Sequence, residues 1–228
     1  MKKEFSRIDL LKNNNVSLYN SILNLIKSEN FPCLFAINSF HKQQMYVYDA
    51  SFIDRAIYEN IYTQLNLFHE TFFKEKDDNK KFYTLLVVIP NIKEVNSKNI
   101  QDTLFELLIG LRAHSSLERK LTHSDILKKD FEYKLNENIW FPVLLCDKHI
   151  SKIRNTNDNF SIVAFQPKKT FDNLKKCPHN FYEKTRSATH VRINKIYPTQ
   201  KPYFLSNKSS GINAIQYLGF DPIHPDEY

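Results

Sequence analysis

The chain of 228 residues contains only three glycines. Phosphate-cradling loops such as the Walker motif and the G-x-G-x-x-G fingerprint need glycines at fixed spacings, because the backbone must turn tightly and approach the phosphates closely. Neither pattern occurs in the sequence. The scarcity of glycine therefore argues against nucleotide-binding folds of these two types.

Cysteine is also scarce. Cys33, Cys146 and Cys177 are odd in number, so they do not form an even disulfide framework, and no C-x-x-C pair is present to bind zinc. Free thiols in a reducing compartment are the simplest interpretation. The N-terminus has no apolar signal region, and no run of about 18 apolar residues occurs. We expect a cytoplasmic protein that does not span a membrane.

Long runs of one charge are absent, although the formal net charge is +7. A positive balance permits nucleic acid, acidic membranes or anionic small molecules as partners. The lysines, however, are interleaved with Asp and Glu, and no run of five or six basic residues exists. This pattern favours a solvated surface. No zinc-finger, RNP or helix-turn-helix signature occurs, which disfavours a basic nucleic-acid-binding module.

Apolar and aromatic residues, by contrast, are plentiful. Hydrophobic residues make up 42% of the chain, which is ordinary for a folded globular protein. Eighteen Phe and twelve Tyr supply large flat side chains. These rings can be explained by packing in the hydrophobic core. The more specific alternative is that some of them line a site for a flat aromatic ligand.

Hydrophobic periodicity predicts helices that alternate with short strands. Helical spacing indicates helices over residues 16–30, 51–73, 96–121, 170–176 and 179–197. Short β-rich runs indicate strands over residues 33–37, 45–48, 82–90, 130–135, 139–146 and 160–167. Because hairpins as well as helices join the strands, we predict an α+β fold with a mixed, mostly antiparallel sheet packed by several helices. No linker divides the chain, so we expect a single domain over residues 1–228 with its core at about 17–219.

A polar hinge, "LLCDKHISKIRN" (residues 144–155), separates two predicted strands. Cys146 and His149 lie three residues apart in it, and a thiolate and an imidazole are both good ligands for iron or zinc. The alternative is a buried cysteine followed by an exposed loop histidine. Lys152 and Arg154 in the hinge, and Arg192 further on, suit carboxylates if they border an apolar pocket, and are surface charges otherwise.

Four stretches resemble motifs of the YqcI/YcgG family. They are "FPCLFAINSF", "LFELLIGLRAH", "IVAFQPKKTFDNLK" and "KPYFLSNKSSGINAIQYLGF". They occur in the family's order and at similar spacing, and together they span about residues 31–219. Each motif alone is degenerate, and the four in sequence are more specific than any one of them.

The resemblance implies a heme-binding protein, because characterised members include the GntA-type heme-dependent N-hydroxylases. These enzymes hydroxylate a guanidino or amino nitrogen of an amino acid with heme iron and an oxidant. The hinge and its two flanking strands would then form one wall of the heme pocket. A family histidine falls on Cys146, which makes Cys146 or the nearby His149 the expected axial ligand of the iron.

The resemblance also assigns further residues to the site. Lys152, Arg154 and Arg192 are candidates for pairing with heme propionates or with a substrate carboxylate. Gln216 and Tyr217 would line the site from the C-terminal segment. A family glutamate falls on Asn213, so a carboxylate that would hold a cationic substrate is missing at that position.

Three hypotheses follow. The first is a heme-dependent oxygenase or N-hydroxylase that acts on a small nitrogenous substrate with a redox partner or peroxide. The second is a heme carrier or sensor without turnover, motivated by the missing glutamate. The third, which rests on charge and aromatic content alone, is the basic nucleic-acid-binding module.

Overall fold

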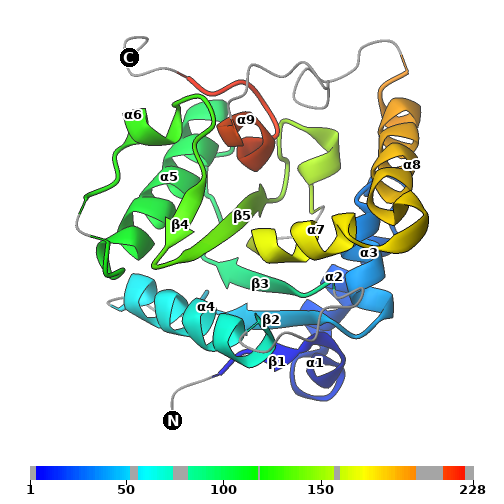
Figure 1. Ribbon diagram of the computed structural model, residues 1–228, viewed down its shortest axis with the longest axis horizontal. Coiled ribbons are helices and arrows are strands. Elements are labelled where there is room, and N and C mark those ends of the chain that lie inside the picture. The colour runs from blue at the N-terminus through cyan, green and yellow to red at the C-terminus, as the bar shows by residue number, and fades with distance from the viewer. Residues whose placement is uncertain are drawn as a thin grey trace.

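The computed structural model describes residues 4–51, 56–73, 82–117, 119–156, 160–198 and 213–223. One six-stranded sheet forms its centre, with the strands in the order β1-β2-β3-β6-β5-β4 (Figure 1). The strands are β1 (Ser6–Arg7), β2 (Met45–Asp49), β3 (Thr84–Ile89), β4 (Tyr133–Leu135), β5 (Asn138–Leu145) and β6 (Ser161–Pro167). Among these strands β2 and β3 run parallel, and the other four neighbouring pairs are antiparallel. The predicted α+β class with a mixed, mostly antiparallel sheet is confirmed.

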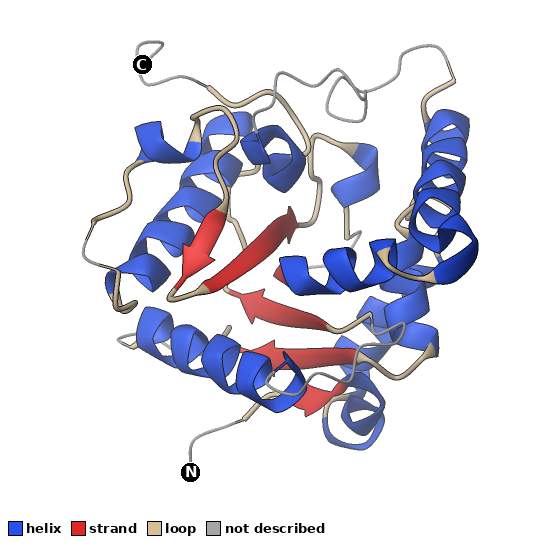
Figure 2. Cartoon of the chain, in the orientation of Figure 1, coloured by secondary structure: helices blue, strands red, loops and turns tan. Residues whose placement is uncertain are grey.

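Helices surround the sheet (Figure 2). They are α1 (Ile8–Asn14), α2 (Val16–Lys27), α3 (Leu34–His41), α4 (Ile57–Phe73), α5 (Ser97–Ala113), α6 (His123–Ile126), α7 (Lys168–Lys175), α8 (Phe181–Ile196) and α9 (Asn213–Leu218), with 3₁₀ turns η1 (Lys152–Arg154) and η2 (Pro178–Asn180). Within the described ranges, none of the helices has both the length and the apolar character needed to cross a membrane.

Strand β3 shows why the sheet is covered on both faces. All six of its residues are buried. Leu85, Val87 and Ile89 belong to one core cluster, which α4, α5 and α9 complete. Leu86 and Val88 belong to the other, which α1 and α2 complete. Because side chains alternate across a strand, a strand buried on both faces must be largely apolar, as this one is from Leu85 to Ile89.

Capping residues define where two of the helices begin. The side chain of Asn15 accepts a hydrogen bond from the Leu18 N–H at 3.2 Å, and α2 begins at Val16, where the predicted helix 16–30 begins. For α5 the cap is Asn96, whose side chain accepts from the Asn99 N–H at 2.8 Å. The helix predicted over residues 96–121 therefore begins within one residue of its predicted start, a shift within the usual uncertainty of a helix end. The first residues of the predicted helix 51–73 include 52–55, which lie outside the described residues.

The strand predicted over residues 33–37 is wrong, because the segment forms helix α3 instead. Cys33 is the N-cap residue, and the helix continues from Leu34 to His41. A run of five residues dominated by apolar side chains fits a buried strand or one turn of a buried helix equally well. Tertiary packing decided the outcome, since α3 packs against α8 and the Leu34 N–H donates to Thr189 Oγ1 on α8 at 3.4 Å.

Candidate functional site

A cavity of about 400 Å³ lies where the start of α3, the start of β5, the hinge, α7, α8 and α9 meet. Three of the seven predicted site residues line it: Arg154, Gln216 and Tyr217. Hollows of about 570 and 620 Å³ elsewhere on the described surface contain none of the seven. The smaller cavity is therefore the candidate functional site.

Three of the four stretches with family resemblance meet at this cavity. The first contributes Cys33 and Phe35, the third contributes Gln166 and Phe171, and the last contributes Tyr217 with its neighbours. The second stretch forms α5, which packs against α9 rather than lining the cavity. Segments far apart in the sequence thus converge on one place.

A continuous row of aromatic rings forms one wall. Its members come from five elements, α9, β5, α7, α3 and α8, and are in order Tyr217, Phe141, Phe171, Phe35 and Tyr182. Neighbouring ring centroids lie 5.2, 6.0, 5.6 and 5.5 Å apart along the row. The first three contacts are edge-to-face, a favoured geometry for aromatic pairs. The wall offers a large apolar surface that excludes water from one side of the site.

Arg154 brings a largely enclosed positive charge to the cavity. Its Nη2 donates to the Gln216 carbonyl at 2.9 Å, at the C-terminal end of α9, where a cation is favourable. Its Nε is buried and has no hydrogen-bond partner among the described residues. Burial lowers the pKa of the guanidinium to about 10, so the group stays protonated at neutral pH.

Gly219 makes room for this arginine. It follows α9 with φ of +82°, in the region that favours glycine. A Cβ at this position would lie 3.0 Å from Arg154 Cγ and 3.2 Å from Nε. The end of α9 and the position of Arg154 are therefore determined together.

Cys33 and His190 are the thiol and the imidazole that line the cavity. Burial raises the pKa of the Cys33 thiol. The backbone N–H groups of Ala36 and Phe35, at the start of α3, and the charge of Arg154 oppose that rise. A helix N-terminus and a nearby arginine are the groups that stabilise a thiolate. Cys33 is thus placed where an additional positive charge, such as a metal ion, would favour its ionised form.

Cationic side chains dominate the rim. Arg154, Lys168, Lys175 and Arg186 line the cavity together with a single carboxylate, that of Glu132. Lys168 pairs with Glu132, and the Lys175 ammonium lies 5.5 Å from the centroid of the Tyr182 ring. Lys175 also pairs with Asp172 at 3.4 Å and Arg186 with Glu183 at 3.9 Å, so the excess of positive charge is partly offset. The charge that remains suits a ligand that carries carboxylates or other anionic groups.

Cys146, predicted as a metal ligand, does not line this cavity. It is fully buried at the end of β5, where its N–H donates to the Arg154 carbonyl at 3.2 Å and its own carbonyl accepts from the Thr156 N–H at 3.1 Å. Burial raises the pKa of the thiol to about 12, and the charge of Asp147 acts in the same direction. At neutral pH Cys146 is therefore an un-ionised thiol in the core.

His149, the other predicted ligand, is 4% exposed and also lies outside the cavity lining. Its Nδ1 accepts the Ser151 N–H at 2.9 Å, so the neutral ring carries its proton on Nε2. Nε2 is buried without a hydrogen-bond partner in the described chain. Burial, followed by the charge of Arg154, lowers the pKa to about 3. In this arrangement neither ring nitrogen presents a lone pair to a metal.

The remaining two predicted residues lie apart from the cavity. Lys152 is exposed on η1. Arg192, on α8, donates from Nη2 to the Phe31 carbonyl at 3.1 Å and so ties α8 to the segment that precedes Cys33. Neither lines the cavity. Arg192 thus contributes to the site indirectly, because it holds the backbone at Phe31, two residues before Cys33.

Sequence reasoning missed Cys33, Phe35 and Glu132 as site residues, and left the orientation of His190 open. For Cys33 the signal was present in the "FPC" motif. Because the segment was predicted as a strand, the position of Cys33 at the start of a helix was not recognised. Glu132 carried no signal of its own, because it lies in the short β4 hairpin and reaches the cavity only through the fold.

The comparisons with known proteins give one match. The model of the YqcI/YcgG family matches residues 21–222, a range that includes every residue lining the cavity. No curated protein and no solved structure matches the chain.

Proposed function

The chain belongs to the YqcI/YcgG family, and from this premise we propose that it binds heme in the 400 Å³ cavity and acts as an oxygenase on the nitrogen of a small amino compound. One observation carries the proposal. Aromatic rings, cationic side chains, a thiol and an imidazole converge on a single cavity, which three of the four motif-like stretches help to line. Heme requires these three features, since it is flat, largely apolar, and carries two carboxylates and an iron.

The lining residues fit heme in the following way. The row of rings from Tyr217 to Tyr182 would lie against the porphyrin and keep water from it. Arg154 and Arg186 would bind propionates through forked hydrogen bonds, with Lys168 and Lys175 adding charge. Heme iron takes only its axial ligands from the protein. Within the described residues no three His, Cys, Asp or Glu side chains gather as a metal site, and heme needs no such group.

Cys33 and His190 are the proposed sources of an axial ligand, because they line the cavity and the predicted pair Cys146 and His149 does not. A cysteine ligand donates electron density to heme iron and favours oxygen activation, whereas histidine gives globin- or peroxidase-like iron. The bound heme would supply the oxidising chemistry. The protein's part is to orient the substrate nitrogen and to hold its charge.

Glu132 is the proposed group for the substrate. Asn213, where the family resemblance leads one to expect a glutamate, donates from Nδ2 to the Phe131 carbonyl at 2.7 Å. Glu132 follows Phe131 directly and lines the same cavity. Its carboxylate is paired with Lys168. A cationic guanidino or amino group would exchange with that lysine, which frees Lys168 for an anionic partner.

Absorption spectroscopy during a hemin titration tests the proposal. We expect a saturable Soret band at one heme per chain. If Cys33 is the axial ligand, the ferrous-CO band should lie at the thiolate position in the parent protein and leave it in Cys33→Ser, while Cys146→Ser, the matched thiol control, keeps the parent spectrum. A protein without a Soret band at any hemin ratio would refute heme binding.

A heme carrier or sensor is the second candidate, favoured by the pairing of Glu132, the one carboxylate in the described lining of the cavity, with Lys168. A carrier or sensor would show the same heme spectrum as the oxygenase but would not convert a substrate. Incubation of the heme-loaded protein with peroxide and arginine, followed by mass spectrometry, separates the two. A product heavier by one oxygen supports the oxygenase, and unchanged arginine across a panel of amino acids supports the carrier.

A further inference from the structure

A further, cationic hollow of about 370 Å³ shares the lining residue Glu132 with the cavity. It is formed by the end of α5, by α6 and by the segment up to β4. Six cationic side chains line it: Arg112, Arg119, Lys120, Lys128, Lys129 and Lys134. The carboxylates that line it are those of Asp125, Asp130 and Glu132. The interleaved sequence gives no sign of this concentration, which arises from the fold.

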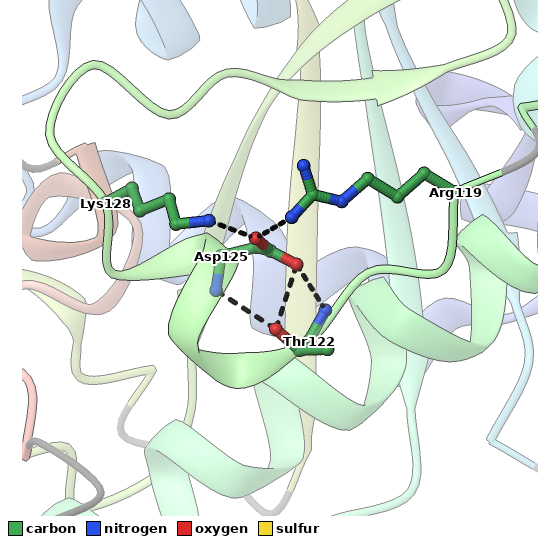
Figure 3. Close-up of polar contacts among 4 residues, drawn as sticks. All are labelled: Arg119, Thr122, Asp125 and Lys128. Carbon is green, nitrogen blue, oxygen red and sulfur yellow. Dashed lines mark hydrogen bonds and ion pairs between the residues drawn. The ribbon is translucent and has the colours of Figure 1, made fainter.

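Asp125 is already saturated by its neighbours (Figure 3). Its Oδ1 accepts from Arg119 Nη2 at 2.9 Å and from Lys128 Nζ at 2.6 Å. Its Oδ2 accepts from the Thr122 N–H at 3.2 Å and from Thr122 Oγ1 at 2.9 Å, which completes the capping box at the start of α6. One carboxylate therefore contacts two cationic side chains at once, both of which remain mostly exposed, and the group carries a net positive charge.

The other cations have even less compensation. Arg112 donates from Nη1 to a neutral group, the Lys134 carbonyl, at 2.6 Å, and its Nε is buried without a partner among the described residues. Lys120, Lys129 and Lys134 have no carboxylate partner within the described chain. Glu132 is engaged by Lys168 on the cavity side. Among the described residues, the lining of the hollow thus carries more positive than negative side chains, an excess that an anionic ligand would offset.

We propose that this hollow is a binding site for a small phosphate-bearing anion. A guanidinium with two N–H edges and surrounding ammonium groups match the oxygens of a phosphate in charge and in hydrogen-bond geometry. The concave shape favours a compact ligand of diphosphate size over an extended polymer. The Asp125 carboxylate draws Arg119 and Lys128 toward the same place, which gathers positive charge where an anion would bind. The inference is independent of heme binding.

Isothermal titration of the full chain with inorganic pyrophosphate at low ionic strength tests this site. We expect one saturable site, and an affinity at least about tenfold weaker in the double variant Lys120→Gln/Lys129→Gln, because charge-assisted hydrogen bonds are strong. Both lysines are exposed, so the variant should fold normally. The matched control is Lys12→Gln/Lys27→Gln, which removes the same charge from α1 and α2. Arg112→Gln should also weaken binding.

Equal weakening in the control and test variants would overturn the proposal, since binding would then follow net charge alone. So would the absence of saturable heat. Titrations with inorganic phosphate and with phenyl phosphate distinguish a free-phosphate site from one for a phosphorylated organic compound, and saturation by either at the same residues supports the proposal. Tighter, length-dependent binding of a single-stranded oligonucleotide through these lysines would instead identify a polyanion surface and refute a compact site.

Discussion

His149 should make the folded state sensitive to acid. The ring is buried and neutral, and burial together with the charge of Arg154 lowers its pKa from 6.5 to about 3. The unfolded chain, in which this histidine has an ordinary pKa, therefore binds one more proton between these two values. Stability is unaffected above about pH 6.5 and falls steadily as the pH drops toward 3.

The size of the effect follows from that shift. Each unit of pKa difference corresponds to about 1.4 kcal/mol. Between pH 7 and pH 4.5 the loss occurs mainly over the two pH units below the unfolded-state pKa of 6.5. His149 alone should therefore remove about 2.5 kcal/mol of unfolding free energy over that range. This is a large fraction of the typical 5–15 kcal/mol by which proteins are stable.

Urea unfolding at pH 7, 5.5 and 4.5 measures this loss. His149→Gln removes the titrating group, so its free energy of unfolding should decrease less steeply with acid than that of the parent protein. His123→Gln is the matched control, because the His123 ring pairs with Glu106 at the surface. Parallel decreases in the parent and in His149→Gln would refute the reasoning and would mean that the imidazole is not held neutral in the core.

Three other outcomes are expected. Gly219→Ala should lower the unfolding free energy by about 1–2 kcal/mol in urea unfolding, because alanine is strained at φ of +82° and its Cβ meets Arg154. The loss should be smaller in an Arg154→Ala background, and an equal loss there would mean that the two residues do not interact. Arg154→Gln should weaken hemin binding about tenfold or more in a Soret titration, whereas the exposed Lys152→Gln should leave it within twofold. Asn96→Ala should cost about 1 kcal/mol through loss of the α5 cap, seen as a lower urea midpoint with an unchanged slope.

Periodicity was enough to predict most of the fold. The apolar run of β3, the β4–β5 hairpin and the amphipathic α2 are local patterns, and each is found where the sequence placed it. The segment at Cys33 failed because five residues give no period, and its contact with Thr189 depends on a helix distant in sequence. A prediction from local sequence cannot include a contact with a residue that comes close only after the chain has folded.

The candidate site was predictable in part for the same reason. Arg154 was predicted from its place in the hinge, and Gln216 and Tyr217 from a motif, and the fold brings all three to one cavity. The proposed roles of Cys146 and His149 rested on their spacing in the sequence and on the position of a family histidine. Spacing does not reveal that β5 carries Cys146 into the core, or that the Ser151 N–H occupies Nδ1 of His149.

The five rings of the cavity wall have a consequence for the folding of the chain. Because each ring comes from a different element, between α3 near the start and α9 near the end, no contiguous fragment contains the whole wall. The cavity exists only when long-range closure is complete, which makes it a late product of folding. Any ligand that occupies it binds the finished structure alone and stabilises it by mass action. The amount of ligand that the protein binds at saturation accordingly reports the fraction of chains that have reached the complete fold.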